Sequence, residues 1–452
     1  MRMVNILMRA SMLPFDNFEI DDILFHDRIW GNSGNLLFVY GLLRNIYKEG
    51  IHVDSYQNPE ERDAGWINEN YDMMLIPLAN AFRDNWIGQL EKWAALIRKL
   101  KIPAVVTGVG IQADYEPGLT KGFKFDGAAR QFAEAVLEKS ESIGVRGEIT
   151  AEYLKRLGIK ESRIDVIGCP SMFTFGSFLP RKAPCRLTGQ SVLSMNYHGS
   201  FQGFFEFLER CKEEYPDYYI VLQGIHDMKL LYAGDKVRKK VHPLYIKDVE
   251  YREFRENRLR QFVDVPSWIH FLKKADLSVG SCIHGSIAAV LAGNPAIVFA
   301  ADARVRELAE YHKIPMIPMK EVNGDTKLAR LYEAIDFSRT AEGHKTRYEV
   351  FCQFLKKNGV PVAEAGGHLN TEFDRKLEET GRKLSGGMES FLAGSREQAS
   401  ENMKKYLLWC GKKIKWHAEQ IQNPGGGKSG SGIGEWIGSL QCVLENLDRY
   451  GE

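Results

Sequence analysis

The sequence predicts a two-lobed α/β protein with parallel sheets and a helical C-terminal extension. Strand-like apolar runs alternate with helical patterns along most of the chain, which is typical of parallel βαβ units. At 452 residues the chain is also longer than one hydrophobic core usually serves. We therefore expect a first lobe over residues 1–180, a second over 190–340 and an extension over 341–452.

The first lobe is predicted from an alternation that starts with a helix over 34–47, after a Gly-Asn-rich segment suited to a helix N-terminus. Short apolar runs typical of buried strands follow at 73–77, 104–107, 143–145 and 164–167. Helical patterns fill the intervals at 85–100, 127–139 and 148–157. The next stretch, 176–190, contains prolines and basic residues and is interpreted as a linker.

The second lobe repeats the alternation. Strands are expected at 192–195, 218–222, 277–279 and 296–299, and helices at 203–211, 266–274, 284–291 and 304–312. Beyond residue 341 the pattern is helical and less regular, and the Gly/Ser-rich segment 424–432 predicts a flexible loop. Open parallel sheets bind ligands beyond the carboxyl ends of their strands, so we expect a ligand in the cleft between the lobes.

Composition narrows the function classes. A formal charge of +1 argues against a nucleic-acid-binding protein, which normally has a basic excess. The seven cysteines are scattered without a CxxC pair, so neither a disulfide framework nor a metal site is expected. The apolar stretch Met3–Met8 is too short for a signal peptide, and no uninterrupted apolar run is long enough for a membrane span. These features predict a cytoplasmic protein.

The segment Gly280–Gly285 is the strongest candidate for chemistry. His284 follows a predicted strand and opens a helix, so its imidazole should lie at the carboxyl edge of the sheet among helix N-terminal amides. The helix dipole lowers the pKa of such a histidine, which suits proton transfer near neutral pH. Ser281 lies in the same turn. The alternative is a structural histidine.

Two arginines are candidates for holding an acid. Arg146 emerges at the end of a short strand just before a helix, and it can bind a carboxylate or phosphate in a forked geometry. Its alternative role is a structural salt bridge. Asp302 is expected to cap the helix that contains Arg304 in its first turn. A cation there opposes the helix dipole unless it shares an anion, which makes Arg304 a candidate ligand for an acid.

Two glycine-containing segments permit more than one interpretation. Small residues over 31–35, including Asn32 and Asn35, leave backbone amides free for an anion, although a simple helix cap is the better interpretation of this segment alone. Residues 108–113 fit the dinucleotide pattern G-x-G-x-x-A, but the next helix is predicted only at about residue 127. A loop that lines the cleft is the better interpretation.

Three further features carry weaker hypotheses. Residues 427–429 imitate the end of a P-loop, but the required upstream glycine and buried strand are missing. The basic stretch 229–260 is usually a solvated face, with an acidic glycan surface as the alternative. Residues 403–416 combine leucines and tryptophans with five lysines, which suits a helix docked on a lobe or a peripheral contact with the inner membrane surface.

Taken together, these pieces resemble the polysaccharide pyruvyl transferase family. The matching segments occur in order from about residue 29 to 318, and each is weak singly. They are Gly-Asn-x-Gly-Asn at 31–35, Ile-Pro-Leu-Ala-Asn at 76–80, Gly-Val-Gly at 108–110, Val-Arg-Gly-Glu at 145–148, Ile-Gly-Cys-Pro at 167–170, Gly-Ser-x-Ile-His-Gly at 280–285, and Asp302-x-Arg304.

The resemblance implies two Rossmann-like lobes arranged as in the GT-B glycosyltransferases. It also implies transfer of the enolpyruvyl unit of phosphoenolpyruvate onto a sugar or lipid-linked oligosaccharide, commonly as a ketal, in exopolysaccharide or cell-surface glycan assembly. His284 would be the acid/base and Arg146 a donor-holding cation, while Asn32 and Asn35 would lie along the cleft. The scheme requires no metal and no cofactor besides the donor substrate.

Two departures from the family pattern are apparent. Cys282 stands where the family usually has arginine, and Cys169 stands where it often has aspartate. A thiol provides neither a permanent charge nor a forked donor set. The alternatives are therefore a GT-B-like glycosyltransferase that uses a nucleotide sugar and a non-catalytic member that binds glycan. A nucleophilic Cys282 is a further, weaker alternative.

Overall fold

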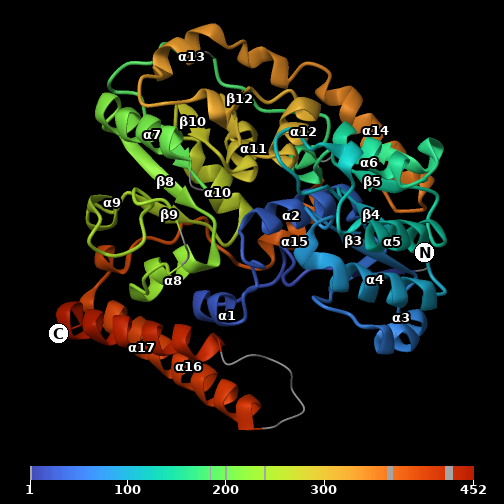
Figure 1. Ribbon diagram of the computed structural model, residues 1–452, viewed down its shortest axis with the longest axis horizontal. Coiled ribbons are helices and arrows are strands. Elements are labelled where there is room, and N and C mark those ends of the chain that lie inside the picture. The colour runs from blue at the N-terminus through green and yellow to red at the C-terminus, as the bar shows by residue number, and fades with distance from the viewer. Residues whose placement is uncertain are drawn as a thin grey trace.

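The computed structural model describes residues 3–183, 185–198, 201–238, 241–363, 370–422 and 431–451. A six-stranded and a four-stranded parallel sheet lie in different parts of the molecule, each with helices packed around it (Figure 1). We call the part built on β1–β6 the first lobe and the part built on β7–β12 the second lobe. The α/β class with parallel sheets and a helical C-terminal region is confirmed.

The first lobe contains a four-stranded parallel sheet in the order β2-β1-β3-β4. Its strands are β1 (Val4–Met8), β2 (Ile51–Ser55), β3 (Met73–Pro77) and β4 (Ala104–Thr107), and β5 (Ile143–Val145) pairs with β6 (Ile164–Val166) beyond β4. The helices are α1 (Ile20–Phe25), α2 (Gly34–Ile46), α3 (Ala64–Asn70), α4 (Ile87–Lys99), α5 (Asp126–Leu137) and α6 (Glu148–Arg156).

The second lobe contains a six-stranded parallel sheet in the order β12-β11-β10-β7-β8-β9. Its strands are β7 (Leu193–Asn196), β8 (Tyr218–Leu222), β9 (Leu259–Gln261), β10 (Leu277–Gly280), β11 (Ala296–Ala300) and β12 (Met316–Pro318). The helices are α7 (Gln202–Glu214), α8 (Ile225–Ala233), α9 (Arg252–Arg255), α10 (Val265–Leu272), α11 (Ile283–Leu291), α12 (Ala303–His312) and α13 (Leu328–Ala334).

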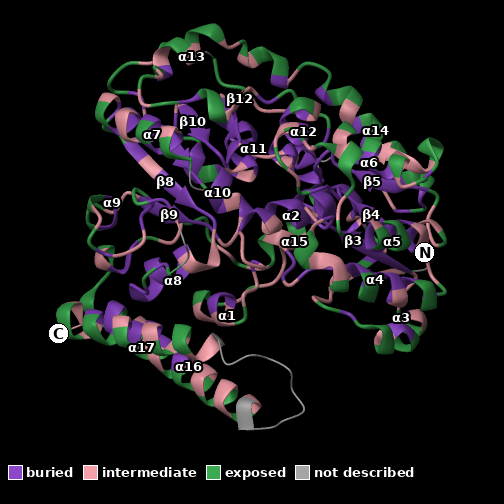
Figure 2. Cartoon of the chain, viewed as in Figure 1, coloured by how far each residue is buried: buried purple, intermediate pink, exposed green. Residues whose placement is uncertain are grey.

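Burial follows the sheets. Strands β3, β4, β10 and β11 are buried along their whole length, as expected for strands with helices on both faces (Figure 2). Strands β1, β2, β9 and β12 and helix α8 were not predicted. β2, β9 and β12 lie at or near sheet edges and are short or polar, so they lack the apolar run that marks a central strand.

The extension packs on both lobes. It comprises α14 (His344–Lys357), α15 (Thr371–Glu378), α16 (Arg396–Gln422) and α17 (Ser431–Tyr450). On the first lobe, Phe351 of α14 stacks on Phe173 at 5.1 Å between ring centroids. Phe373 of α15 meets Tyr40 edge-on at 5.1 Å. The predicted loop over 424–432 lies mostly outside the described residues, and its last two residues belong to α17.

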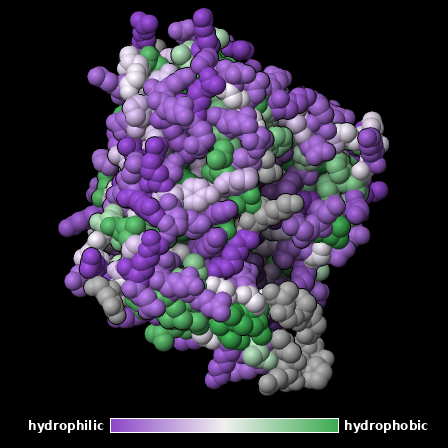
Figure 3. All heavy atoms as spheres, turned by 60° about the vertical axis from the view of Figure 1, so that its left-hand side comes forward, coloured by the Kyte–Doolittle hydropathy of each residue, from purple (hydrophilic) through white to green (hydrophobic). Residues whose placement is uncertain are grey.

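Helices α16 and α17 form a hairpin that docks on the second lobe. Tyr406 donates a 2.6 Å hydrogen bond to the buried carboxylate of Asp235. The ammonium of Lys229 on α8 lies 4.6 Å from the Trp436 ring centre and 5.5 Å from that of Trp409. Hydrophobic side chains gather at the lower end of the molecule, where this hairpin lies (Figure 3). Among the described residues, none of the helices combines the length and hydropathy needed to cross a bilayer.

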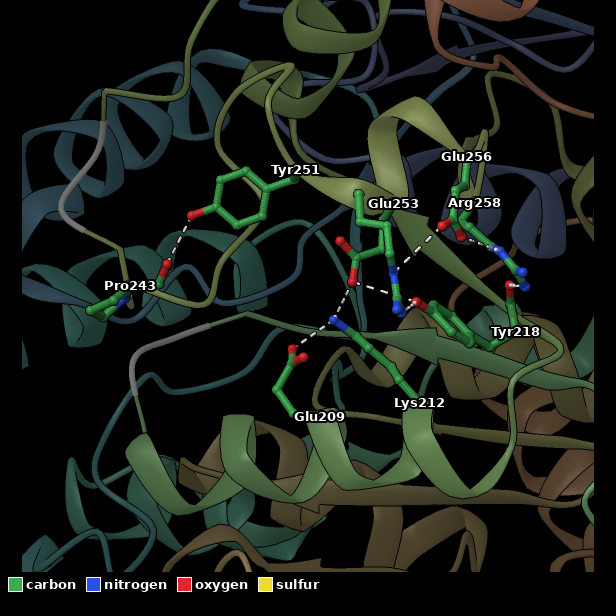
Figure 4. Close-up of polar contacts among 9 residues, drawn as sticks. Glu209, Lys212, Tyr218, Pro243, Tyr251, Glu253, Glu256 and Arg258 are labelled. Carbon is green, nitrogen blue, oxygen red and sulfur yellow. Dashed lines mark hydrogen bonds and ion pairs between the residues drawn. The ribbon is translucent and has the colours of Figure 1, made fainter.

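Charges in the basic stretch of the second lobe are largely used in ion pairs. The ammonium of Lys212 lies 2.6 Å from carboxylates of both Glu209 and Glu253, and Lys212 and Glu253 are buried (Figure 4). Described arginines between 238 and 260 pair with acids in the same way: Arg238 with Asp235, Arg252 and Arg258 with Glu256, Arg255 with Glu250, and Arg260 with Glu389. This pairing of the described arginines fits the interpretation of residues 229–260 as a solvated face.

Candidate functional site

The turn between β10 and α11 is built around Asn196, the last residue of β7. The Asn196 side-chain oxygen accepts a 2.8 Å hydrogen bond from the Cys282 amide, and its backbone oxygen accepts one from Ser281 at 3.1 Å. A Cβ atom on Gly280 would lie 2.2 Å from the Asn196 oxygen atoms, and one on Gly285 would lie 2.6 Å from its side-chain nitrogen. Both glycines are therefore required by this close approach, and they place His284 in the first turn of α11.

The His284 ring lies where the two lobes meet. A Cβ atom on Gly34, the first residue of α2, would lie only 2.4 Å from its Nδ1 atom, so the ring packs directly on that helix start. Its Nε2 atom lies 3.8 Å from the sulfur of Cys169 in the first lobe. The N-termini of α2 and α11 therefore converge on one half-buried imidazole, and their dipoles favour an anion there.

Arg146 is buried beside this point, with 1% of its surface exposed. Its Nε–H donates to the Gly108 carbonyl oxygen at 3.0 Å, and its aliphatic part lies against Gly110. One terminal nitrogen, Nη2, is buried without a hydrogen-bond partner. The structural salt bridge considered as an alternative is absent among the described residues, since no carboxylate lies within ion-pair distance of Arg146.

Asp302 and Arg304 lie at the start of α12, close to the same junction. The Asp302 carboxylate caps the helix by accepting the Val305 amide hydrogen at 2.9 Å, as predicted. Arg304 donates to that carboxylate at 3.3 Å, while its Nε atom is buried without a partner. The backbone of Asp302 also forms an isolated bridge to Asp114 of the first lobe, which joins the loops that follow β11 and β4.

Burial is the main influence on the protonation of His284, and the two arginines add to it. Burial, together with the positive charges of Arg146 and Arg304, lowers the pKa of His284 to about 3. Burial also lowers the pKa of Arg146. His284 is consequently neutral at pH 7 and able to accept a proton, and an anion bound beside the arginines would raise its proton affinity.

Three of the predicted site residues have structural hydrogen bonds. The Asn32 side chain accepts the Gly34 amide hydrogen at 2.8 Å, while the N-cap of α2 is Ser33, whose side chain makes no cap hydrogen bond. Asn35 donates to backbone oxygens at 3.1 and 3.2 Å within the preceding turn. The Ser281 hydroxyl accepts from the His198 amide at 2.8 Å and donates to its carbonyl at 3.1 Å.

The two cysteines that depart from the family pattern are both next to His284. Cys282 is the N-cap of α11, and Cys169 faces the His284 ring. Burial raises the pKa of Cys282 to about 12 and also raises that of Cys169. Both are therefore thiols at neutral pH, which argues against the nucleophile alternative for Cys282. Neither provides a charge beside the histidine.

Sequence reasoning missed several polar residues around the site. Gln223 joins Asn196 beside Gly285, and one side-chain nitrogen of each is buried without a partner. Glu307 is buried on α12 and accepts two hydrogen bonds from Thr150 at the start of α6. Burial raises the pKa of Glu307 to about 7. Asn196 and Gln223 end or follow predicted strands, so the carboxyl-edge rule could have found them.

A cavity lined in part by residues of α2 lies apart from the predicted site residues. It has a volume of about 390 Å³ and is lined by side chains that include Leu13, Leu36, Tyr40, Val265 and Leu377. None of the predicted site residues lines it. Among the described residues, no group of three or more histidines, cysteines or carboxylates is arranged to hold a metal ion.

Comparison with known families decides the assignment. The model of the polysaccharide pyruvyl transferase family matches residues 32–302, which is more than half of the chain. The chain belongs to this family. It is accordingly a transferase, and the matched range contains Asn32, Arg146, His284 and Asp302, whereas Arg304 lies just beyond it. No curated protein matches the chain.

Solved structures show distant similarity. The UDP-GlcNAc 2-epimerase of Methanocaldococcus jannaschii, solved with UDP-GlcNAc and UDP, is 12% identical, covers 79% of this chain and 99% of its own, and gives a TM-score of 0.41. The UDP-GlcNAc 2-epimerase of Neisseria meningitidis bound to UDP-GlcNAc is 10% identical, covers 79% of this chain and 100% of its own, and gives a TM-score of 0.39. Anabaena Alr3699/HepE in complex with UDP and glucose is 12% identical, covers 83% of this chain and 100% of its own, and gives a TM-score of 0.38.

Proposed function

We propose that this transferase moves the enolpyruvyl unit of phosphoenolpyruvate onto a sugar, as a ketal, in exopolysaccharide or cell-surface glycan assembly. The observation that carries the proposal is the grouping at the lobe junction. A neutral histidine lies between two helix N-termini and beside two arginines that each retain an unpartnered buried nitrogen. Phosphoenolpyruvate presents a carboxylate and a phosphate, and such a site suits both.

The reaction needs two proton movements and one departure. Protonation of the vinyl CH₂ carbon of the donor gives a methyl group and an oxocarbenium-like centre at C2. A sugar hydroxyl oxygen bonds to C2 and loses its proton, the C2–O bond to phosphate breaks, and a second hydroxyl completes the ketal. The protons lost by the two hydroxyls balance the one gained by carbon and the one carried away by phosphate.

In this scheme His284 handles the proton and the arginines hold the anions. The bound donor offsets the charges of Arg146 and Arg304, raises the pKa of His284 and allows it to act as the acid. Once it has given its proton to the donor carbon, the neutral His284 suits the base role towards a sugar hydroxyl. Asn32, Asn35, Ser281 and Asp302 shape the binding site around these groups.

The acceptor is proposed to be a sugar or a lipid-linked oligosaccharide at the cytoplasmic face of the inner membrane. Support comes from α16, on which Leu408 is 70% exposed and Trp416 45% exposed. Exposed lysines at 404, 412 and 415 lie on the same helix. Apolar side chains interleaved with lysines suit a peripheral contact with anionic lipid.

The experiment is phosphate release from phosphoenolpyruvate, measured across candidate acceptors with the wild type and His284→Ala. We expect acceptor-dependent release that falls by about 10²–10⁴-fold in the variant, the usual contribution of a general acid or base. Unchanged ketal formation in His284→Ala would refute the role of the histidine. Thermal stabilisation by UDP-sugars and not by phosphoenolpyruvate would instead favour a glycosyltransferase.

A further inference from the structure

Arg83 is a cation that the proposed reaction does not yet use. It lies between β3 and α4, and its Nη1 atom donates to the Gln112 side-chain oxygen at 3.4 Å. The same oxygen accepts a hydrogen from Asn80 at 2.7 Å. The Nε atom of Arg83 is buried without a partner, and Arg83 takes part in no ion pair among the described residues. An arginine of this kind retains both charge and donors for a ligand.

The loop after β4 places Arg83 near Arg304. Gln112 contacts Arg83, and the next residue, Ala113, accepts a 3.1 Å hydrogen bond from the amide of Ala303. Arg304 directly follows Ala303, and the pKa of Arg83 is lowered by burial and, to a smaller extent, by the positive charge of Arg304. Asp302 is the carboxylate that partners Arg304, whereas Arg83 has no carboxylate partner among the described residues.

Arg9 is a third cation, and it lies near the same Trp86 ring as Arg83. The guanidinium carbons of Arg9 and Arg83 lie 5.5 Å and 5.3 Å from the centre of the Trp86 ring. Arg9 is only 8% exposed, lies 3.7 Å over Trp30, and has an unpartnered buried Nε atom. Burial lowers its pKa to about 9. Packing cations together without acids is unfavourable in the ligand-free protein, and a bound anion reverses the effect.

We propose that Arg83 and Arg304 together bind a phosphate-type anion, forming a second anion subsite beside Arg146 and His284. The role of this subsite in catalysis rests on the proposed pyruvyl transfer, but its ability to bind phosphate does not. Two sources supply the same chemistry: the phosphate of the donor, or a phosphate carried by the acceptor sugar. Arg83 is then a specificity-determining residue for a phosphorylated substrate.

Calorimetric titration of the full-length protein with inorganic phosphate at low ionic strength tests the subsite. We expect Arg83→Gln to weaken phosphate binding by about tenfold or more, because one charge-assisted contact is lost. Arg83→Lys should recover part of the affinity because it keeps the charge. Arg98→Gln, on the exposed face of α4 where Arg98 lies near Glu138, is the matched control and should bind phosphate as the wild type does.

Melting temperatures separate binding from a structural role. Removing a charge that opposes Arg304 should leave the ligand-free Arg83→Gln protein as stable as the wild type or more stable. A lower melting temperature with unchanged phosphate affinity would show that Arg83 is structural and would overturn the proposal. Phosphate affinity equal to that of the Arg98→Gln control would overturn it as well.

A competition arm identifies the source of the phosphate. If saturating phosphoenolpyruvate abolishes the Arg83-dependent binding, the subsite belongs to the donor. If inorganic phosphate still binds in its presence and this binding requires Arg83, the subsite belongs to a phosphorylated acceptor. Absence of pyruvyl transfer with intact Arg83-dependent phosphate binding would refute the proposed reaction and leave the subsite standing.

Discussion

Gly34 offers the sharpest test of how the site is assembled. A methyl group at this position would lie 2.4 Å from Nδ1 of His284 and 2.9 Å from the side-chain oxygen of Asn32. Ordinary van der Waals contact begins at about 3.4 Å, so Gly34→Ala must displace the imidazole by about 1 Å. A shift of that size in a reacting group reduces turnover by about 10²-fold.

Gly34→Ala should lower the stability of the protein, although alanine has the higher helix propensity. Alanine is preferred over glycine in a helix by up to about 1 kcal/mol, but overpacking costs about 1–3 kcal/mol. We therefore expect Gly34→Ala to be destabilised by roughly 1–2 kcal/mol in urea unfolding. Gly88→Ala is the matched control, since Gly88 also lies in the first turn of its helix and nothing lies within 4 Å of its added methyl group.

The two assays together can refute the reasoning. The rate of phosphate release and the free energy of unfolding in urea should both be lower for Gly34→Ala than for the wild type. For Gly88→Ala both quantities should match or exceed the wild-type values. If Gly34→Ala kept both the wild-type turnover and the wild-type stability, the contact between α2 and His284 would not exist in solution. Loss of stability with normal turnover would remove His284 from the chemistry.

Three other predictions concern pH and packing. The folded pKa of His284 is depressed to about 3, so its contribution to the free energy of unfolding is present above pH 6.5 and is lost as the pH falls. Between pH 7 and 5 the free energy of unfolding should fall by up to about 2 kcal/mol from this group. The free energy of unfolding of His284→Gln should depend correspondingly less on pH. The folded pKa of Glu307 is raised to about 7, so its contribution to the free energy of unfolding is complete below pH 4.5 and is lost as the pH rises through 7. The free energy of unfolding of Glu307→Gln, measured across that range, should lack this decrease, even though the contact with Thr150 is partly kept. Tyr406→Phe removes the hydroxyl that donates at 2.6 Å to the buried Asp235, and it should lower the free energy of unfolding by about 1–3 kcal/mol. The loss should be seen as faster amide hydrogen exchange in α16. An unchanged exchange rate would contradict the docking described for the hairpin.

Local pattern predicted much of the fold and one side of the site. His284 was placed correctly at a strand-to-helix turn because the apolar run before it and the glycines around it are visible within a few residues. Its contact with Cys169 could not be predicted, because the two residues are 115 positions apart and follow strands of different sheets. Arg83 was missed for the same reason, since its proximity to Arg304 depends on a loop between other elements.

The path of the C-terminal extension affects how the molecule behaves when its chain is cut. Helices α14 and α15 are embedded in the first lobe, where Asn358 hydrogen-bonds Ser142 and Asn370 hydrogen-bonds backbone oxygens at the end of α2, yet they follow the second lobe in the chain. A protease that cleaves once within 176–192 would therefore yield two fragments that remain interlocked, because the larger one still fills the core of the smaller. Such a nicked protein should elute as one particle, and separating the fragments should require denaturant.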